Sequence, residues 1–223
     1  MANLGLPIAQ VAKALAEPSR VAMLDVLMDG DSHAIGHLAR AAHVSPGTAS
    51  THLQILVEAG LVSVANHGRE RRVRIADHDV AEILERLATL TTRTDNAIRY
   101  ARTCYDHLAG VLAILVVQQL IDRAWLHPTT DNLEPSPDLI AWLEDHGQPV
   151  AASKRPLSRA CLDWTERVPH VAGRVGAALC AVFVENEWVT RIAGTRALRV
   201  TSRGRKALAA ELGLTLPVLP SAR

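Results

Sequence analysis

Aromatic side chains are scarce in this 223-residue sequence, which has four Trp, two Tyr and one Phe. All seven lie after residue 99. The first hundred residues must therefore build their apolar core almost wholly from Ala, Val, Leu, Ile and Met. This shift in composition predicts two modules, and the chain is long enough for each of them to bury its own core.

Net charge is also nearly absent, at +1, which excludes a protein that binds nucleic acid through a uniformly basic surface. Cysteine is limited to Cys104, Cys161 and Cys180. Because no signal-peptide pattern opens the sequence, three cysteines lead us to expect a reduced, cytoplasmic setting. The longest apolar run, 108–117, is too short to span a bilayer, so no membrane partner is expected.

One stretch, residues 44–62, has the signals of a well-defined helix. Ser45 is a favoured N-cap, Pro46 suits the first turn, and Gly60 is typical of a helix end. Apolar residues at helical spacing predict one buried stripe, formed by Ala49, Leu53, Leu56 and Val57.

The opposite face of this helix carries short, uncharged residues. In the first two turns these are Gly47, Thr48, Ser50, Thr51 and His52. Such a face can enter a DNA major groove and approach the base edges. An ordinary amphipathic surface helix would have the same buried stripe, so the flanking segments must decide between the two interpretations.

The flanking segments favour DNA binding. Upstream, 32–43 predicts a second helix, with Ser32 as its cap and Ile35, Leu38 and Ala41 or Ala42 facing inward, which makes a helix-turn-helix. Downstream, 61–65 and 71–75 predict two strands joined by a turn at 66–68. We call this hairpin the wing. Its arginines, which suit phosphate contact, are Arg69, Arg71, Arg72 and Arg74.

Three motifs in this region resemble the ArsR/SmtB family of winged-helix repressors. They are ALAEPSRVAML at 14–24, the helix start at 44–53, and EAGLV at 58–62, and the similarity runs from about residue 8 to residue 90. The resemblance implies a homodimer on a partly palindromic DNA operator, released by a metal or another effector. It assigns DNA contacts to Ser45, Gly47, Thr48, Ser50, Thr51 and His52, whereas Pro46 departs from the polar residue often found in the family.

The effector sites that the resemblance implies are incomplete in this sequence. Segment 34–41, where some members carry a thiolate pair, contains no Cys. The zinc site after the wing is matched by Asp-His-Asp at 77–79, but 90–93 offers only Leu-Thr-Thr-Arg for its second half. Since a metal needs its full ligand set, we favour a second role for Asp77, as a helix cap.

The next helix is the predicted dimer seam. Residues 80–90 form an amphipathic pattern with Ile83, Leu84 and Leu87 on one side. The threonine-rich stretch that follows, 91–95, is a poor helix interior. We therefore predict a DNA-binding and dimerisation domain at 1–94 and a C-terminal effector and dimerisation domain at 95–223.

The C-terminal domain carries one pattern twice. ARTCYDH at 101–107 returns as SRACLDW at 158–164, and each copy is followed by Ala-Gly and an apolar helix. We predict two winged-helix-like repeats, 99–150 and 156–215, with a pocket at their seam. The expected fold class is therefore mainly α with small β-hairpin wings, α+β overall.

Each copy contains Arg-x-Cys-x-Asp. On a helix the Arg and Asp would pair within each copy, and Cys104 and His107 would share a face. Three interpretations of the cysteines stay open: core packing, a soft-metal, haem or thiol-redox site, and an organic ligand beside the tryptophans. The candidate effector residues are Cys104, His107, Cys161, Asp163, Trp164 and His170, with Cys104, His107 and Cys161 as metal ligands if a metal binds; Cys180 is expected in the core.

Two functions follow from these patterns. The first is an effector-responsive, homodimeric DNA-binding repressor, with no resident cofactor or with a soft metal, haem or small organic effector. The alternative is an enzyme or ligand-binding module that uses Cys104 or Cys161, with the winged helix as a docking unit. No nucleophile elbow, phosphate loop or carboxylate pair supports an enzyme, so we expect the regulator.

Overall fold

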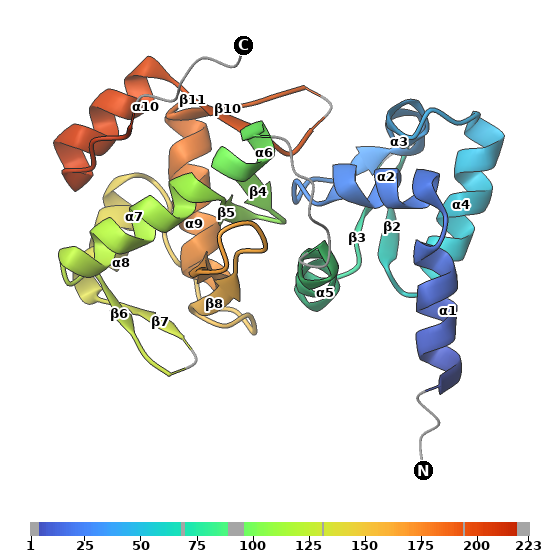
Figure 1. Ribbon diagram of the computed structural model, residues 1–223, viewed down its shortest axis with the longest axis horizontal. Helices are drawn as coiled ribbons and strands as arrows, with labels where there is room; N and C mark the ends of the chain where they lie inside the picture. Colours follow the sequence, from blue (N-terminus) through green and yellow to red (C-terminus); the bar gives the residue numbers. More distant parts are fainter. Residues whose placement is uncertain (1–4, 68–69, 89–95, 131, 194, 218–223) are drawn as a thin grey trace. The chain divides into compact units, whose positions relative to one another are not determined.

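The structure of the chain, a computed structural model, describes residues 5–67, 70–88, 96–130, 132–193 and 195–217. It divides into two compact units (Figure 1). The first comprises the chain up to residue 88 with the short segments 103–106 and 193–196, and the second comprises the remainder. The predicted break at 91–95 lies outside the described residues. No described helix combines the length and apolarity that a membrane crossing requires.

The first unit is a winged helix-turn-helix with an aliphatic core. Met23, Leu27, Leu38 and Leu56 are among its fully buried side chains, as the lack of aromatics requires. Its helices are α1 (Gly5–Leu15), α2 (Pro18–Leu27), α3 (Ile35–Ala41), α4 (Pro46–Glu58) and α5 (His78–Ala88).

A three-stranded antiparallel sheet completes this unit, with β1 (His33–Ala34), β2 (Val62–His67) and β3 (Glu70–Ile75) in the order β1-β3-β2. The alternation in β3 places Val73 and Ile75 in the core and Arg74 in solvent, as predicted. The turn predicted at 66–68 is wrong in part, because residues 66 and 67 belong to β2.

The predicted start of α3 is also wrong. Residues 33–34 form β1, which pairs with β3 through Ala34 and Arg72. Because these residues are extended, α3 begins at Ile35, with Ala34 as an N-cap that makes no side-chain hydrogen bond. Ser32 therefore does not cap the helix.

From residue 96 onward, short hairpins alternate with helices. After α6 (Asn96–Tyr100), the order hairpin, helix, hairpin, helix occurs twice. The first set is β4 (Arg102–Cys104), β5 (His107–Ala109), α7 (Val111–Asp122), β6 (Leu126–Pro128), β7 (Leu133–Pro135) and α8 (Pro137–Asp145). The second is β8 (Arg159–Leu162), β9 (Pro169–Ala172), α9 (Gly173–Glu185), β10 (Val189–Arg191), β11 (Leu198–Val200) and α10 (Ser202–Ala207), which a π-helical turn extends through Leu208–Leu212.

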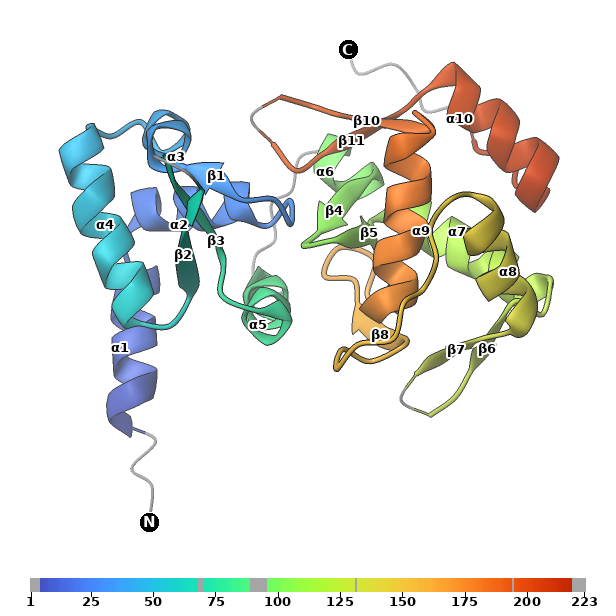
Figure 2. The same ribbon diagram turned by 180° about the vertical axis from the view of Figure 1, so that it is seen from behind.

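Helix α9 runs through the middle of the second unit, against β5 and β9, in both Figure 1 and Figure 2. Gly176 makes this approach possible. A Cβ added to Gly176 would overlap the Val171 carbonyl of β9 and would lie 3.2 Å from the Cβ of His107 on β5. The absence of a side chain at this position therefore lets α9 lie directly on the two hairpins.

We expect Gly176→Ala to lower the free energy of unfolding by about 1–3 kcal/mol, because the added methyl group must push α9 away from β9. Gly36→Ala in α3 is the matched control. Its new Cβ would meet only the Arg40 guanidinium, at an ordinary 3.8 Å, so this change should be neutral or stabilise by up to about 1 kcal/mol. Urea unfolding followed by circular dichroism compares the two variants, and equal stabilities would contradict the tight contact.

Candidate functional site

Helix α4 has the cap and the buried stripe that the sequence predicts. The Ser45 hydroxyl accepts a hydrogen bond from the Thr48 amide at 3.1 Å. Ala49, Leu53 and Leu56 are buried. Val57 was predicted on this stripe but is 43% exposed, because it lies one position round the helix from Leu56.

The face of α4 opposite the stripe is exposed and bears no charge in its first two turns. Gly47, Thr48, Ser50 and Thr51 are all exposed. Ser50 donates its hydroxyl to the Pro46 carbonyl at 2.9 Å, and Thr51 donates to Gly47 at 3.3 Å. These bonds hold the two hydroxyls close to the helix backbone, so the surface stays slim while their oxygens still offer acceptor lone pairs.

His52 is less exposed than the other members of the predicted DNA-facing set. Its side chain is half-buried, and its Nε2 lies 2.8 Å from the Ser19 hydroxyl on α2. Ser19 in turn donates to Glu17 at 2.9 Å, and this hydrogen bond helps to lower the pKa of the Glu17 carboxyl. His52 therefore links α4 to α2.

The arginines of the wing differ in their surroundings. Arg71 and Arg74 are exposed. Arg72 is half-buried and donates to the Ser32 carbonyl at 2.9 Å, which ties β3 to the residue before β1. Arg69 lies outside the described residues. Together with the exposed face of α4, Arg71 and Arg74 make up the candidate nucleic-acid interface.

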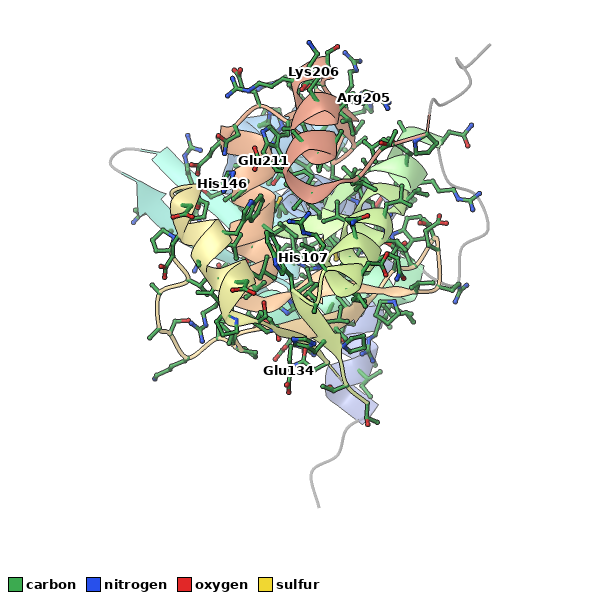
Figure 3. All side chains as sticks on the ribbon, turned by 90° about the vertical axis from the view of Figure 1, so that its left-hand side faces the viewer. His107, Glu134, His146, Arg205, Lys206 and Glu211 are labelled. Atoms are coloured by element: carbon green, nitrogen blue, oxygen red, sulfur yellow. The ribbon has the colours of Figure 1, made fainter. Side chains whose placement is uncertain are left out.

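A second candidate site is a buried cluster of two cysteines and two histidines. Cys161 and His170 lie opposite each other in the β8–β9 hairpin. Cys104 and His107 flank the two-residue turn between β4 and β5. The ligand atoms of all four lie within 4.8 Å of one another, and no more than 2% of any of these residues is exposed. We call these residues the Cys–His cluster; Figure 3 labels His107 among the surrounding side chains.

The two histidines of the cluster face each other, with 3.1 Å between their Nε2 atoms. The other ring nitrogen of His170, Nδ1, lies 3.3 Å from the Asp163 carboxylate. Burial acts to lower the pKa of His170, but its hydrogen bonds to Asp163 and Cys161 outweigh that effect and raise the pKa to about 9.

Asp163 is fully buried and is held by many donors. The Arg102 guanidinium lies 3.1 Å from its carboxylate, and the amides of Gly110 and Thr165 donate to it at 2.7 and 2.9 Å. Burial acts to raise the pKa of Asp163, but the hydrogen bond to His170 and the charge of Arg102 outweigh it and hold the pKa well below its usual range.

The helical pairing predicted for Arg-x-Cys-x-Asp is wrong. Both copies are hairpins, and Arg102 of the first copy pairs with Asp163 of the second. Cys104 and His107 come together across a turn instead of along a helix face. Sequence reasoning did not find this pairing, because nothing local in the sequence links residues 61 positions apart.

The predicted counterpart of His107 was also wrong. Trp164 aligns with His107 in the repeat, but the second hairpin is longer, so His170 takes the matching place opposite Cys161. The Trp164 ring lies 5.1 Å from the Arg102 guanidinium and covers the buried ion pair. Cys180 is buried in the apolar core, as predicted.

The sequence predicted a pocket at the seam of the two repeats and, as one alternative, an organic ligand beside the tryptophans. Trp125, Trp142 and Trp188 pack with one another, and Trp188 also packs with Phe183 at a ring distance of 5.1 Å. A cavity of about 400 Å³ lies between α7, the β6–β7 hairpin and the β8–β9 hairpin, so segments of both predicted repeats line it. No tryptophan is among the described residues that line it.

At the start of α5, Asp77 accepts a hydrogen bond from the Val80 amide at 2.9 Å, so its predicted role as a cap is confirmed. His78, Asp79 and Glu82 bring their ligand atoms close together. The segment 90–93, which would supply the second half of the zinc site implied by the resemblance, lies outside the described residues.

We expect Asp163→Asn to lower the free energy of unfolding by about 3–5 kcal/mol, because it removes the charge of a fully buried carboxylate that pairs with Arg102. Glu166→Gln is the control. It removes a partner of Arg99 in an ion pair whose arginine is 57% exposed, so the free energy of unfolding should stay close to that of the wild type. Thermal and urea unfolding measure both, and a loss below 1 kcal/mol for Asp163→Asn would contradict the importance of the buried pair.

Comparison with known proteins finds similarity to bacterial transcriptional regulators. Residues 17–64 match the family described as bacterial regulatory protein, arsR family. The chain is 36% identical over 222 residues to the uncharacterized HTH-type transcriptional regulator YdfF of Bacillus subtilis (strain 168). This alignment covers 94% of the chain and 98% of YdfF. It is also 37% identical over 75 residues to the HTH-type transcriptional repressor SmtB of Mycobacterium tuberculosis (strain ATCC 25618 / H37Rv). That alignment covers 34% of the chain and 55% of SmtB.

Among solved structures, the chain is similar to a fragment (1–100) of Mb0332 from Mycobacterium bovis. That fragment is described as a homodimeric winged helix-turn-helix DNA-binding domain of a possible ArsR-family regulator. The identity is 35% and the TM-score 0.38, and the match covers 40% of this chain and 82% of the fragment.

Proposed function

The chain belongs to the ArsR family of bacterial regulatory proteins, and from this membership we propose that it is a cytoplasmic homodimeric repressor that an effector releases from its operator. The observation that carries the proposal is the exposed, slim and uncharged face of α4, together with the exposed arginines of the wing. In this proposal the base edges are contacted by Gly47, Thr48, Ser50 and Thr51. Ser45 contacts the DNA sugar-phosphate backbone beside these bases.

Wing arginines complement this face. Since the net charge of the chain is only +1, attraction to phosphate must be local. Arg71 and Arg74 are exposed and can reach phosphates, whereas Arg72 is held to Ser32 and Arg69 is a candidate from sequence alone. Phosphate contacts fix the register of the protein on DNA, and the α4 face supplies sequence preference.

The proposed dimer uses α5, and we include α1 because it also exposes a large apolar side chain. On α5, Ile83 is 53% exposed and Leu87 is 42% exposed, and on α1, Ile8 is 62% exposed. Large apolar side chains exposed together on helices are typical of an interaction surface. A two-fold pair of these subunits would present two α4 helices to half-sites about one helical turn apart, which suits a partly palindromic operator.

Release by an effector requires that the effector bind the DNA-free form more tightly than the DNA-bound form. The Cys–His cluster and the 400 Å³ cavity are places for a metal, a thiol-redox signal or a small molecule. The cluster argues against the enzymatic alternative, because Cys104 and Cys161 are at most 2% exposed and a nucleophile must be reached by its substrate.

The DNA interface is tested by selecting preferred sites from a random duplex library and measuring affinity by fluorescence anisotropy. Ser50→Ala and Thr51→Ala should change the selected sequence and lose about 1–3 kcal/mol on the wild-type site. Arg71→Ala should weaken binding to all sequences alike and reduce the slope of log K against log salt by about 1.

Arg203→Ala, which removes an exposed arginine of the second unit, is the matched control and should leave the slope unchanged. Wild-type protein that selects no sequence and retards no duplex at low salt would refute the proposal.

The dimer is tested by light scattering during size exclusion. Ile83→Glu and Leu87→Glu should each shift the mass from dimer to monomer, because a charge in an apolar seam is desolvated without a partner. Leu157→Glu, at a site in the second unit that is 41% exposed, should leave the mass unchanged. If all three variants remain dimeric, α5 is not the seam.

A further inference from the structure

We propose that the Cys–His cluster is a binding site for one tetrahedral d¹⁰ metal ion, and that Zn²⁺ is its best match. The ligands are Cys104 and His107 from the first hairpin and Cys161 and His170 from the second. The site is separate from α4 and α5, so it does not depend on how the chain contacts DNA.

The ligand set and its spacing fit such an ion. Two sulfurs and two imidazole nitrogens form a common tetrahedral zinc set. With Zn–N bonds of 2.0–2.1 Å, two nitrogens on a tetrahedron lie about 3.3 Å apart. The Nε2 atoms of His107 and His170 are 3.1 Å apart, and every pair of ligand atoms is within 4.8 Å. An ion at the centre therefore requires only small side-chain adjustments.

Asp163 supplies the outer support that a metal-binding histidine needs. A ligating histidine usually donates its second ring N–H to a carboxylate, which fixes the ring and its tautomer. His170 has its Nδ1 3.3 Å from the Asp163 carboxylate and directs its Nε2 towards His107. Asp163 is itself fixed by Arg102 and by the Gly110 amide, so its orientation does not depend on an ion.

Charge balance also favours the ion at this depth. Zn²⁺ with two thiolates and two neutral imidazoles has no net charge, and the adjacent Arg102 and Asp163 also sum to zero. A site that is neutral overall avoids much of the penalty for burying charge. Cysteine packing as a small apolar residue is the competing explanation, and Cys180 in the apolar core is an example of it. That explanation does not account for two histidines buried face to face beside two thiols.

The first test measures metal directly, without DNA. Protein purified without chelator should hold about one zinc per chain by elemental analysis. Cobalt titration of the metal-stripped protein should saturate at one equivalent, with the visible d–d bands of a tetrahedral site and a thiolate charge-transfer band. This measurement needs no variant, so a folding defect cannot confuse it.

Variants then assign the ligands. Cys104→Ala, Cys161→Ala, His107→Ala and His170→Ala should each reduce retained zinc at least tenfold and remove or shift the cobalt bands. Cys180→Ala, which alters an equally buried cysteine outside the cluster, should retain its metal and the wild-type spectrum. Circular dichroism confirms that each variant is folded.

Two results would overturn the proposal. One is wild-type protein that neither retains a metal ion nor gives a tetrahedral cobalt spectrum. The other is a folded Cys161→Ala variant with unchanged zinc content and bands. The DNA-face variant Ser50→Ala should keep its zinc, so failure of this site and failure of the proposed DNA binding are distinguishable.

Discussion

The second unit depends on the hydrogen bonds and the ion pair of one buried carboxylate, that of Asp163. It accepts hydrogen bonds from Arg102 at the start of β4 and from the Gly110 amide at the start of α7, and it lies beside His170 of β9. One side chain thus joins the two hairpins and fixes a helix end. A carboxylate at this depth is stable only when its charge is matched and its oxygens are satisfied, and both conditions are met.

The first unit is organised differently, because the fully buried apolar side chains of its core are aliphatic or Met and the face proposed for DNA lies in solvent. Burial of Ala49, Leu53 and Leu56 orients α4 and leaves the short side chains of its opposite face in solvent. His52 and Arg72, which the sequence places with the DNA-facing set, instead form hydrogen bonds within the fold. They hold α4 and the wing in place, so the geometry of the exposed face depends on residues that do not belong to it.

Local signals were sufficient for much of the fold. The Ser45-Pro46 start, the stop near Gly60, the Arg-Val alternation of β3 and the Asp77 cap all act within a few residues, and each was read correctly. The short strands β1, β4, β5, β8 and β9 were missed. A strand of two to four residues has too few positions to show an alternation, and it forms only because another strand pairs with it.

The repeated Arg-x-Cys-x-Asp marks where chemistry is concentrated in the second half, and the sequence alone identified Cys104, His107, Cys161 and His170 as candidates. It could not determine which of the buried side chains face each other. Arg102 pairs with Asp163, and Cys161 faces His170, because the two hairpins meet in the folded chain. The sequence thus determined the helix-turn-helix, whose contacts are short-range, whereas the tertiary structure decided the buried cluster, whose partners are about 60 residues apart and are brought together only by packing.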